Sequence, residues 1–566
     1  MHAVTADDAR SRWLERLGVL VILLAGLLPR ARDFFAPFDR EFEGAQAAYF
    51  AIGAVNYERL GIARTGGYPV FNIDLGARDD LRRGIWDHPQ SWIVYANHPP
   101  LVPLVAWAAA EVGGIGEAGP GPDWNAAWKQ GLAPSGLEPW MRAPFLASSL
   151  LALLALWWAV RQAAGARRAM LALAIASATP VTIVYATLVN YENPALLCLL
   201  LAAGFFARWI RRDGQRDLLL CALAFGAGSC VTFSGLFLLP PLALLAWSRR
   251  GARPALRFAS LGLLAGCAPL ALHAAWSRIA QQRLGFDPPP LVARVRELWQ
   301  PLIDGSHPIG EWAGLQLERI AGWFTLPIAL AACAGLAIWL ASALRRSKAR
   351  EAATGHDRSL DLEPALLAGG ALALFAFYRH TLDPQFTFLM LLVPAIAGFA
   401  ALALDRVSPL LERLRAGRAP LALLTGSLAL FGILQAERLR FDFRAGAGET
   451  FAGREAPPLP LPDLSGKEIA TLVPAGGFAI HPACLGLNLA VSYYAWRSLW
   501  PANSPRDPMP GLVARRAGLE AAPRVLLLPK HPWPAVAASI SEFEEQLVDN
   551  APPDRESEHW RAWDLH

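Results

Sequence analysis

The sequence predicts an all-α polytopic membrane protein of about eleven transmembrane helices, with a small external α/β domain at its C-terminus. The 566 residues are 54% hydrophobic, with a mean hydropathy of +0.30. Only 17% of them are charged, against about 25% in an ordinary soluble protein. Many apolar runs have the ~18–25 residues that cross a bilayer. The net charge of +5 does not indicate nucleic acid, because the arginines cluster between these runs, as in cytoplasmic loops.

The basic clusters orient the predicted spans. The first span is predicted at Trp13–Leu28, and the arginines before it place the N-terminus in the cytoplasm. The next span, Ala143–Val160, returns to a second arginine cluster, so residues from about 31 to 140 form one external loop. Keeping every later basic cluster in the cytoplasm requires further spans at Ala169–Leu188, Pro194–Ala207, Leu218–Trp247 (crossing twice, with a bend near Ser234-Gly235), Leu256–Ala275, Gly322–Leu344, Pro364–Tyr378, Phe386–Leu404 and Pro420–Leu434.

The chain divides into two predicted domains. Residues 1–440 form the transmembrane domain, with the active site in its external loop 31–140. Residues 441–566 form the external α/β domain, because the sequence becomes more polar after about residue 440. Within it, Val525–Leu528 is predicted as a buried strand and Ser541–Val548 as a helix.

The external loop opens with an acidic segment, Phe38-Asp39-Arg40-Glu41-Phe42-Glu43. Asp39 is a good helix N-cap, and Glu41 and Glu43 suit the first turn of a helix. Read alone, the segment is a helix start. Three acidic residues just outside a membrane helix also suit catalysis, because a partly desolvated carboxylate has a raised pKa and becomes a usable general base.

A second segment, Asn97-His98-Pro99-Pro100, opens the short apolar run Leu101–Val112. The run has too few residues to span a membrane, so it is predicted to be a helix lying against the interface; a buried helix of an external domain is the alternative. Proline is a normal first residue of a helix, and a helix N-terminus attracts anions. His98 then suits donation to a phosphate or metal binding, although no closely spaced histidine or cysteine accompanies it.

Two further groups are predicted on the same external side. Glu192 and Asn193 occupy a turn between two spans, where polar residues are ordinary. Arg379 and His380 end an outward span. An external arginine is unusual there and suits an anionic lipid head group, although snorkelling to the interface also explains it.

Together these motifs resemble the dolichyl-phosphate-mannose protein mannosyltransferase-like superfamily, which includes bacterial aminoarabinose transferases acting on lipid A (glycosyltransferase families 39 and 83). The resemblance rests on the acidic helix start Asp39–Gly44, His98-Pro99-Pro100-Leu101, Arg142-Ala143-Pro144 and Tyr191-Glu192-Asn193-Pro194, in order, after a first span. It covers roughly residues 10–440. It implies the GT-C fold of integral-membrane glycosyltransferases.

The resemblance implies an inverting transfer of a sugar from a polyprenyl-phosphate donor to an acceptor hydroxyl or phosphate. The acceptor is a lipid, a glycan or a protein. The family's first-loop aspartate, the base, matches Asp39; because this chain has Asp-Arg-Glu rather than Asp-Glu, the role can also fall to Glu41 or Glu43. Where some members have Glu-Lys, this chain has Asn97-His98, so the lipid-phosphate role passes to His98, and no metal is assigned although a divalent ion stays open.

The same resemblance, with the Ala/Arg/Gly/Pro-rich composition, implies the inner membrane of a bacterium. The arginine clusters place the N-terminus in the cytoplasm and, after eleven spans, the C-terminal domain in the periplasm. The expected partners are the polyprenyl-linked donor, its acceptor and membrane lipids, and no nucleic acid. Three rival functions remain. A lipid or glycan flippase would place ionisable groups near the bilayer midplane. A ligase or polymerase would need key residues in the later external loop 277–320, such as His307, and an assembly protein would act through its C-terminal domain.

Overall fold

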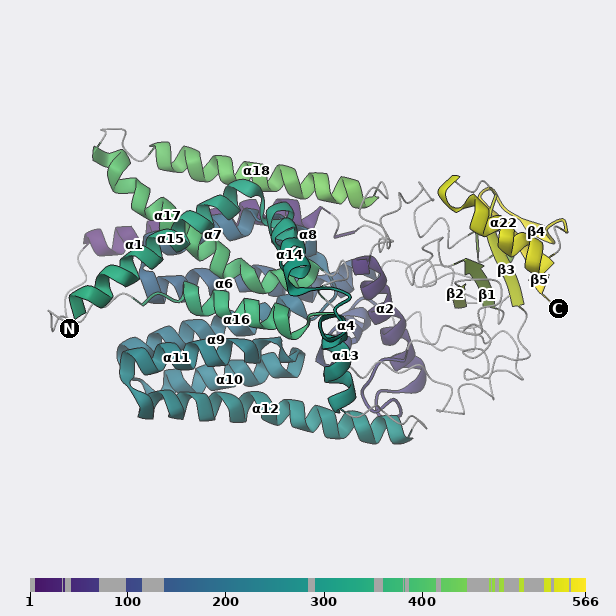
Figure 1. The fold of residues 1–566 in the computed structure, drawn as a ribbon, viewed down its shortest axis with the longest axis horizontal. Helices are drawn as coiled ribbons and strands as arrows, with labels where there is room; N and C mark the ends of the chain where they lie inside the picture. Colours follow the sequence, from purple (N-terminus) through teal and green to yellow (C-terminus); the bar gives the residue numbers. More distant parts are fainter. Residues whose placement is uncertain are drawn as a thin grey trace.

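The computed structural model describes most of the transmembrane domain and the core of the C-terminal domain. The described residues are 6–32, 34–35, 42–70, 98–114, 137–283, 291–350, 360–379, 381, 386–413, 419–444, 468–469, 471–473, 478–482, 498–502, 524–530, 534–548 and 551–565. They form an elongated helical bundle, with a small sheet and one helix beyond one end of it (Figure 1).

The described elements before residue 445 are helices. They are α1 (Ala6–Ala31), α2 (Phe42–Leu60), α4 (Leu101–Val112), α6 (Glu138–Ala164), α7 (Ala166–Ala178), α8 (Pro180–Val184), η2 (Tyr185–Thr187), α9 (Glu192–Arg212), α10 (Gln215–Val231), η3 (Phe233–Leu238), α11 (Leu239–Arg250), α12 (Ala252–Arg283), α13 (Leu291–Ile303), α14 (Ile309–Phe324), α15 (Leu326–Arg350), α16 (Glu363–Ala376), η4 (Phe386–Leu392), α17 (Val393–Arg413) and α18 (Ala419–Arg444).

The prediction of a multi-span membrane protein is confirmed. Among the described residues, six helices are long and apolar enough to cross a membrane, and a seventh span arises if the bent pair α7–α8 is counted as one. The predicted number was about eleven, and each predicted span overlaps a helix. The difference arises because α10, α11 and α16 are shorter than a full span and α1 carries more charge. The count of eleven therefore stays a prediction.

Burial separates inner from outer helices. The apolar window of α17 is 89% buried and that of α9 is 61% buried, whereas the windows of α12, α15 and α18 are only 22%, 17% and 11% buried. The latter three also expose many leucine side chains. Apolar side chains facing outward in this way suit a lipid environment. The bundle therefore has a protein-packed centre and a lipid-compatible rim.

The predicted hairpin at Leu218–Trp247 has the expected bend. Helix α10 ends at Val231, the 3-10 segment η3 turns the chain, and α11 begins at Leu239. Two further connections are tight: Gly165 ends α6 with φ 97° and Gly251 ends α11 with φ 85°. This region of backbone space favours glycine, which has no Cβ to clash. The helices can therefore reverse direction within one residue.

Arginines gather at the end of the bundle where these tight connections lie. Arg161 of α6 pairs with Glu15 of α1 at 2.5 Å, and Arg167 pairs with Asp405 at 3.3 Å. Arg208 pairs with Asp217 at 3.0 Å. These pairs tie α1, α6, α7, α9, α10 and α17 together at one end, as expected if that end faces the cytoplasm.

A broken helix lies within the bundle. Helices α7 and α8 are bent by 65° at Thr179. Proline at residue 180 disfavours helical backbone in the residue before it. The guanidinium of Arg30, which is fully buried, donates to Ser177 O at 2.7 Å, to Thr182 Oγ1 at 2.7 Å and to Gly26 O at 2.8 Å. The end of α1 thus supplies donors to one carbonyl group and one hydroxyl group on the two sides of the break, Ser177 O and Thr182 Oγ1.

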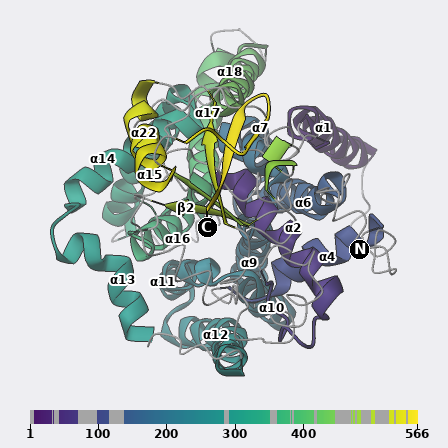
Figure 2. The ribbon, with the colours of Figure 1, turned by 90° about the vertical axis from the view of Figure 1, so that its right-hand side faces the viewer.

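The described part of the C-terminal domain is a five-stranded mixed sheet with one helix. The elements are β1 (Phe478–Pro482), β2 (Ser498–Ala502), β3 (Arg524–Pro529), α22 (Pro534–Val548), β4 (Arg555–Glu556) and β5 (Trp560–Leu565), in the sheet order β2-β1-β3-β5-β4. Strand β1 is parallel to β2 and β3, and β5 is antiparallel to β3 and β4. Val525–Leu528 is fully buried, which confirms the predicted strand. Figure 2 shows the sheet and α22 in front of the helix ends.

Candidate active site

Helices α2 and α4 of the predicted external loop lie side by side and run in the same direction. Trp107 Nε1 donates to Glu58 Oε1 at 2.5 Å, and the Trp107 ring lies 6.5 Å from that of Tyr57. Near the other end of the pair, Phe50 and His98 both contact the ring of Tyr191. Residue numbers therefore rise in the same direction along both helices. The N-termini of α2 and α4 lie at the same end, as the sequence motifs require if they are to meet.

The α2–α4 pair packs on the ends of three bundle helices, α6, α9 and α10. A shared apolar core buries one face of each helix of the pair. The bundle contributes Leu137, Met141, Phe145, Val189, Tyr191, Ala195 and Val231 to this core. The short helix α4 has the predicted bounds, and its buried residues are Val102, Pro103, Ala106 and Ala110. Packing of this kind fixes both helix starts against the bundle.

His98 lies between two aromatic rings. Its imidazole stacks on Tyr191, with centroids 4.2 Å apart and planes 28° apart, and on Phe233, with centroids 5.8 Å apart and planes 10° apart. The ring of Phe233 in turn lies 5.0 Å from that of Phe377. These contacts bring the start of α4, the start of α9, η3 and the end of α16 together. The stacking fixes the plane of the imidazole, and the ring nitrogens can therefore form hydrogen bonds only in that plane.

The predicted turn residues lie beside this stack. Glu192 and Asn193 open α9, directly after Tyr191. Asn193 is fully buried, and its Nδ2 donates to Tyr185 O at 2.7 Å. The carboxylate of Glu192 in the first turn of α9 suits the positive end of the helix dipole. Asn193 therefore has a structural contact, and Glu192 lies directly after the stacked residue Tyr191 in the sequence.

Arg379 lies near the same end but is already paired. Its Nη1 donates to Glu297 Oε1 of α13 at 2.7 Å, and its backbone N–H donates to Leu298 O at 3.0 Å. The Arg379 side chain is 48% exposed. A lipid phosphate at Arg379 would have to compete with Glu297. Its predicted phosphate role therefore has less support than that of His98.

The remaining predicted site residues lie outside the part that the structure describes. These are Asp39, Glu41, Asn97 and His380. The backbone of Glu43 belongs to the first turn of α2, but its side chain is also outside the described part. The catalytic and phosphate-binding assignments of these residues stay predictions.

A carboxyl pair at the far end of α2 and α4 was not predicted. Glu111 of α4 faces Glu58 of α2, beside Trp107. Burial, together with the hydrogen bond and the negative charge of Glu58, raises the pKa of Glu111 to about 7. The i, i+4 spacing of Trp107 and Glu111 places both on one helix face, but only the packing of α2 brings Glu58 to them.

A second group that was not predicted consists of three side chains of α14 that donate hydrogen bonds to Thr381, in the segment after α16. In α14, Trp312 Nε1 donates to Thr381 Oγ1 at 2.8 Å and Gln316 Nε2 donates to Thr381 O at 2.9 Å. Arg319 Nη1 donates to the same carbonyl oxygen, and its residue is only 8% exposed. Helix α14, in the later loop predicted at residues 277–320, thus packs on the segment after α16. His307, the residue considered for a ligase or polymerase, accepts at its backbone carbonyl from the hydroxyl of Tyr378 at 2.7 Å.

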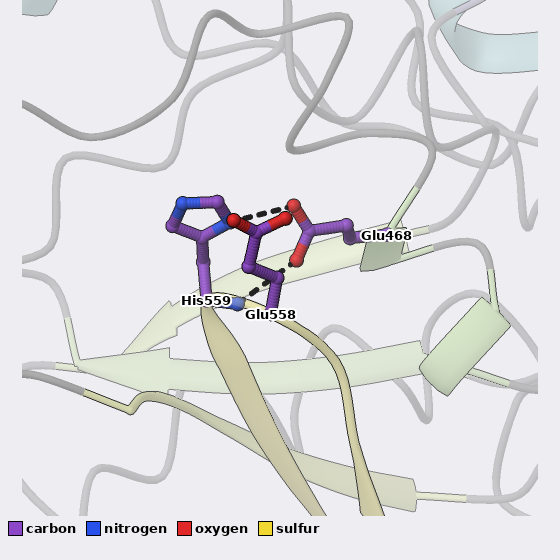
Figure 3. A group of neighbouring side chains, drawn as sticks. All are labelled: Glu468, Glu558 and His559. Atoms are coloured by element: carbon purple, nitrogen blue, oxygen red, sulfur yellow. Dashed lines mark hydrogen bonds and ion pairs between the residues drawn. The ribbon is translucent and has the colours of Figure 1, made fainter.

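Among the described residues, one group of acidic and histidine side chains lies close enough together to hold a metal ion: Glu468, Glu558 and His559 of the C-terminal domain (Figure 3). The carboxylate of Glu468 accepts from Ser557 Oγ at 2.6 Å and from the His559 backbone N–H at 3.1 Å, and it lies 2.7 Å from His559 Nδ1. Although burial acts in the opposite direction, these partners hold the pKa of Glu468 below its usual value. The group ties residue 468 to the C-terminal hairpin, and it carries no metal assignment.

Comparison with known proteins agrees with this architecture. The family described as dolichyl-phosphate-mannose-protein mannosyltransferase matches residues 117–276, which run from before α6 into α12. ArnT from Cupriavidus metallidurans in the apo state is similar in structure, with a TM-score of 0.52 and 15% identity over 98% of both chains. The same protein bound to undecaprenyl phosphate gives a TM-score of 0.50 and 15% identity, over 96% of this chain and 97% of that one.

The oligosaccharyltransferase of Archaeoglobus fulgidus in its apo form has a TM-score of 0.51 and 12% identity, over 91% of this chain and 69% of that one. No curated protein matches the sequence. At these identities the solved structures establish the fold, and the family match covers the segment from before α6 to α12. The resemblance seen in the sequence is thus confirmed: residues 117–276 match this mannosyltransferase family, and the whole chain has the GT-C fold of the ArnT structures.

Proposed function

We propose that this glycosyltransferase moves a sugar from a polyprenyl-phosphate donor to an acceptor hydroxyl or phosphate, with inversion, at the end of the bundle that carries α2 and α4. The observation that carries the proposal is the stacking of His98 on Tyr191 and Phe233, because it joins the start of α4 to the turn that opens α9 and to η3. The similar structures support the donor class: one is ArnT bound to undecaprenyl phosphate, and another is AglB in complex with a dolichol-phosphate and an inhibitory peptide.

The proposed reaction is a single displacement. The base takes the proton of the acceptor hydroxyl while its oxygen attacks the anomeric carbon, and the bond from that carbon to the phosphate oxygen breaks. The polyprenyl phosphate leaves with one more negative charge than it carried in the donor. Asp39 is the proposed base, with Glu41 and Glu43 as alternatives. General-base assistance of this kind contributes about 10²–10⁴-fold.

His98 is the proposed partner of the departing phosphate. It lies at the N-terminus of α4, where backbone N–H groups also attract an anion. A donor already in place when the charge develops needs no reorganisation, and its removal typically costs about 10²–10³-fold in rate. Arg379 and His380 are secondary candidates for the same role, with Arg379 requiring exchange of Glu297 for phosphate.

The proposed site faces the periplasm of a bacterium, with the N-terminus in the cytoplasm and residues 441–566 as a periplasmic domain. The arginine pairs at the opposite end of the bundle support this orientation. A lipid-linked donor fits such a face, because nucleotide sugars are not supplied there. The acceptor is a lipid, a glycan or a protein.

The purified protein tests the proposal directly. It is incubated in detergent with a panel of polyprenyl-phosphate sugars labelled in the sugar, together with a membrane lipid and protein extract. The expected result is a labelled product whose new linkage has the anomeric configuration opposite to that of the donor. If the label stays on every donor and the protein moves the lipid across the bilayer of proteoliposomes, the flippase function would be supported instead.

A further inference from the structure

The turn before α9 buries a carboxamide that has no hydrogen-bond partner within the described part of the chain. Asn190 is fully buried, and neither its Oδ1 nor its Nδ2 has a hydrogen-bond partner among the described residues. Three residues later, Asn193 is equally buried; its Nδ2 donates to Tyr185 O, but its Oδ1 has no described partner either. Two neighbouring asparagines thus present one NH₂ group and two carbonyl oxygens that the described chain does not use.

Such a concentration calls for a ligand. More than about 90% of buried polar groups in proteins have a hydrogen-bond partner, because an unpaired one loses its hydration without compensation. An asparagine side chain can make up to about four hydrogen bonds, two as donor and two as acceptor. Leucine of similar size would fill the space of Asn190 without this cost. A polar ligand can hydrogen-bond to an asparagine at this position, whereas it cannot hydrogen-bond to a leucine.

The position of Asn190 places these groups at the proposed active site. Its neighbour Tyr191 stacks on His98 at 4.2 Å and contacts Phe50 of α2 at 5.6 Å. Asn190 is therefore one residue from the side chain that joins the starts of α4 and α9 to α2. Asn190 thus belongs to the turn that carries the aromatic partner of the proposed phosphate-binding histidine.

The chemistry selects the ligand. Sugar hydroxyls both donate and accept, so they can satisfy the Nδ2 of Asn190 and the Oδ1 atoms of both asparagines. A phosphate only accepts, which would leave both Oδ1 atoms unmatched. Neutral hydroxyl groups are the ligands that fit this donor and acceptor set.

Resting on the proposed function, we propose that Asn190, with Asn193 Oδ1, forms the subsite that binds hydroxyl groups of the sugar carried by the polyprenyl-phosphate donor. The subsite positions the sugar ring while His98 holds the phosphate. Asn190 then contributes to recognition of the sugar and not of the lipid phosphate.

Asn190→Leu tests the subsite, with Asn56→Leu as the matched control. Asn56 is a fully buried asparagine of α2 whose Nδ2 donates to Val70 O at 2.6 Å, away from the helix start. The first measurement compares thermal unfolding in detergent. Asn190→Leu is expected to keep or raise Tm, because it removes an unpaired buried group, whereas Asn56→Leu is expected to lower it. The opposite signs separate a binding residue from a structural one.

The second measurement compares binding of polyprenyl-phosphate sugars with binding of bare undecaprenyl phosphate. For the sugar that the wild type transfers, Asn190→Leu is expected to weaken binding at least tenfold and to lower kcat/KM accordingly, with binding of the bare lipid unchanged. Equal weakening of both ligands, unchanged binding of both, or a lower Tm that accounts for the loss of activity would overturn the subsite. A wild type that binds both lipids equally and transfers no sugar would overturn the proposed function itself.

Discussion

The imidazole of His98 stacks on the phenol ring of Tyr191, with ring centroids 4.2 Å apart. This one contact joins the start of the short helix α4 to the turn that opens α9. The sequence motifs containing these residues lie more than ninety positions apart, and the fold makes them neighbours. If the stack positions a phosphate-binding nitrogen, the aromatic ring of residue 98 should determine stability and its ring nitrogens should determine the rate of sugar transfer.

Substitution of His98 by phenylalanine separates them. His98→Phe keeps an aromatic ring between Tyr191 and Phe233, so Tm is expected to stay within a few degrees of the wild type. Loss of the ring nitrogens is expected to lower kcat by about 10²-fold, the usual effect of removing one electrostatic donor. Sugar-transfer rates on folded protein check this. Full activity in the His98→Phe variant would remove His98 from the proposed mechanism.

The buried arginine at the end of α1 stabilises the broken helix. Arg30→Ala removes three hydrogen bonds and leaves Ser177 O buried without the guanidinium donor, so the free energy of unfolding is expected to fall by roughly 3 kcal/mol. Thermal unfolding in detergent measures the loss. Arg32→Ala is the control, because Arg32 is 55% exposed and pairs with Glu437, and an exposed pair contributes at most about 1 kcal/mol. Equal effects of the two substitutions would contradict the role given to Arg30.

The carboxyl pair Glu58–Glu111 predicts how stability changes with pH. The pKa of Glu111 is 4.5 in the unfolded chain and rises to about 7 in the fold, through burial and through Glu58. Between these values the folded state binds more protons than the unfolded state, so stability falls as pH rises through this window. Wild-type Tm is therefore expected to decline from pH 4.5 to 7.

Glu111→Gln is expected to remove this decline and to raise Tm at about pH 8, above the folded-state pKa, relative to the wild type. The exposed residue Glu318 supplies the control, since Glu318→Gln should leave the pH profile unchanged. Tm measured at half-unit steps of pH gives the answer. A decline that persists in Glu111→Gln would assign the titration to another group.

The Glu468–His559 contact predicts an acid-sensitive C-terminal domain. The partners Ser557 and His559 hold the pKa of Glu468 below its usual 4.5 despite burial. Its contribution to stability is then present above pH 4.5 and is lost as pH falls through the lower, folded-state pKa. Glu468→Gln should increase hydrogen exchange in residues 555–565 at neutral pH, whereas Glu558→Gln, at an exposed position, should not. Equal exchange in both variants would mean that the contact does not hold the hairpin.

The arginine clusters made much of the membrane fold predictable. Basic residues on both sides of Leu218–Trp247 required two crossings there, and the structure has a break between α10 and α11. The bend at Thr179 was not predicted, because the apolar run 169–188 was interpreted as one continuous helix. Pro180 disfavours helical backbone in the residue before it, and this effect was not considered. That proline was the available signal.

The site was less predictable because burial of polar groups is a tertiary property. A polar turn containing Asn190 reads as solvated, and nothing in the chain says that its amide is enclosed. Glu58 and Glu111 are separated by most of the external loop, so only the packing of α2 on α4 reveals the pair. By contrast, the helix start at residue 101 followed from a local signal, the proline before α4. The acidic segment predicted a helix from residue 40, and the described part of α2 begins at Phe42.

The most direct measurement compares sugar transfer by the wild type with transfer by Asp39→Asn, Glu41→Gln and Glu43→Gln, each purified and shown by its Tm to be folded. Labelled product is expected from the wild type, with the rate in Asp39→Asn lowered by about 10²–10⁴-fold and the rates in the two glutamate variants lowered less. Full transfer by all three variants would contradict a carboxylate base at the start of α2, and with it the placement of the active site at the shared end of α2 and α4.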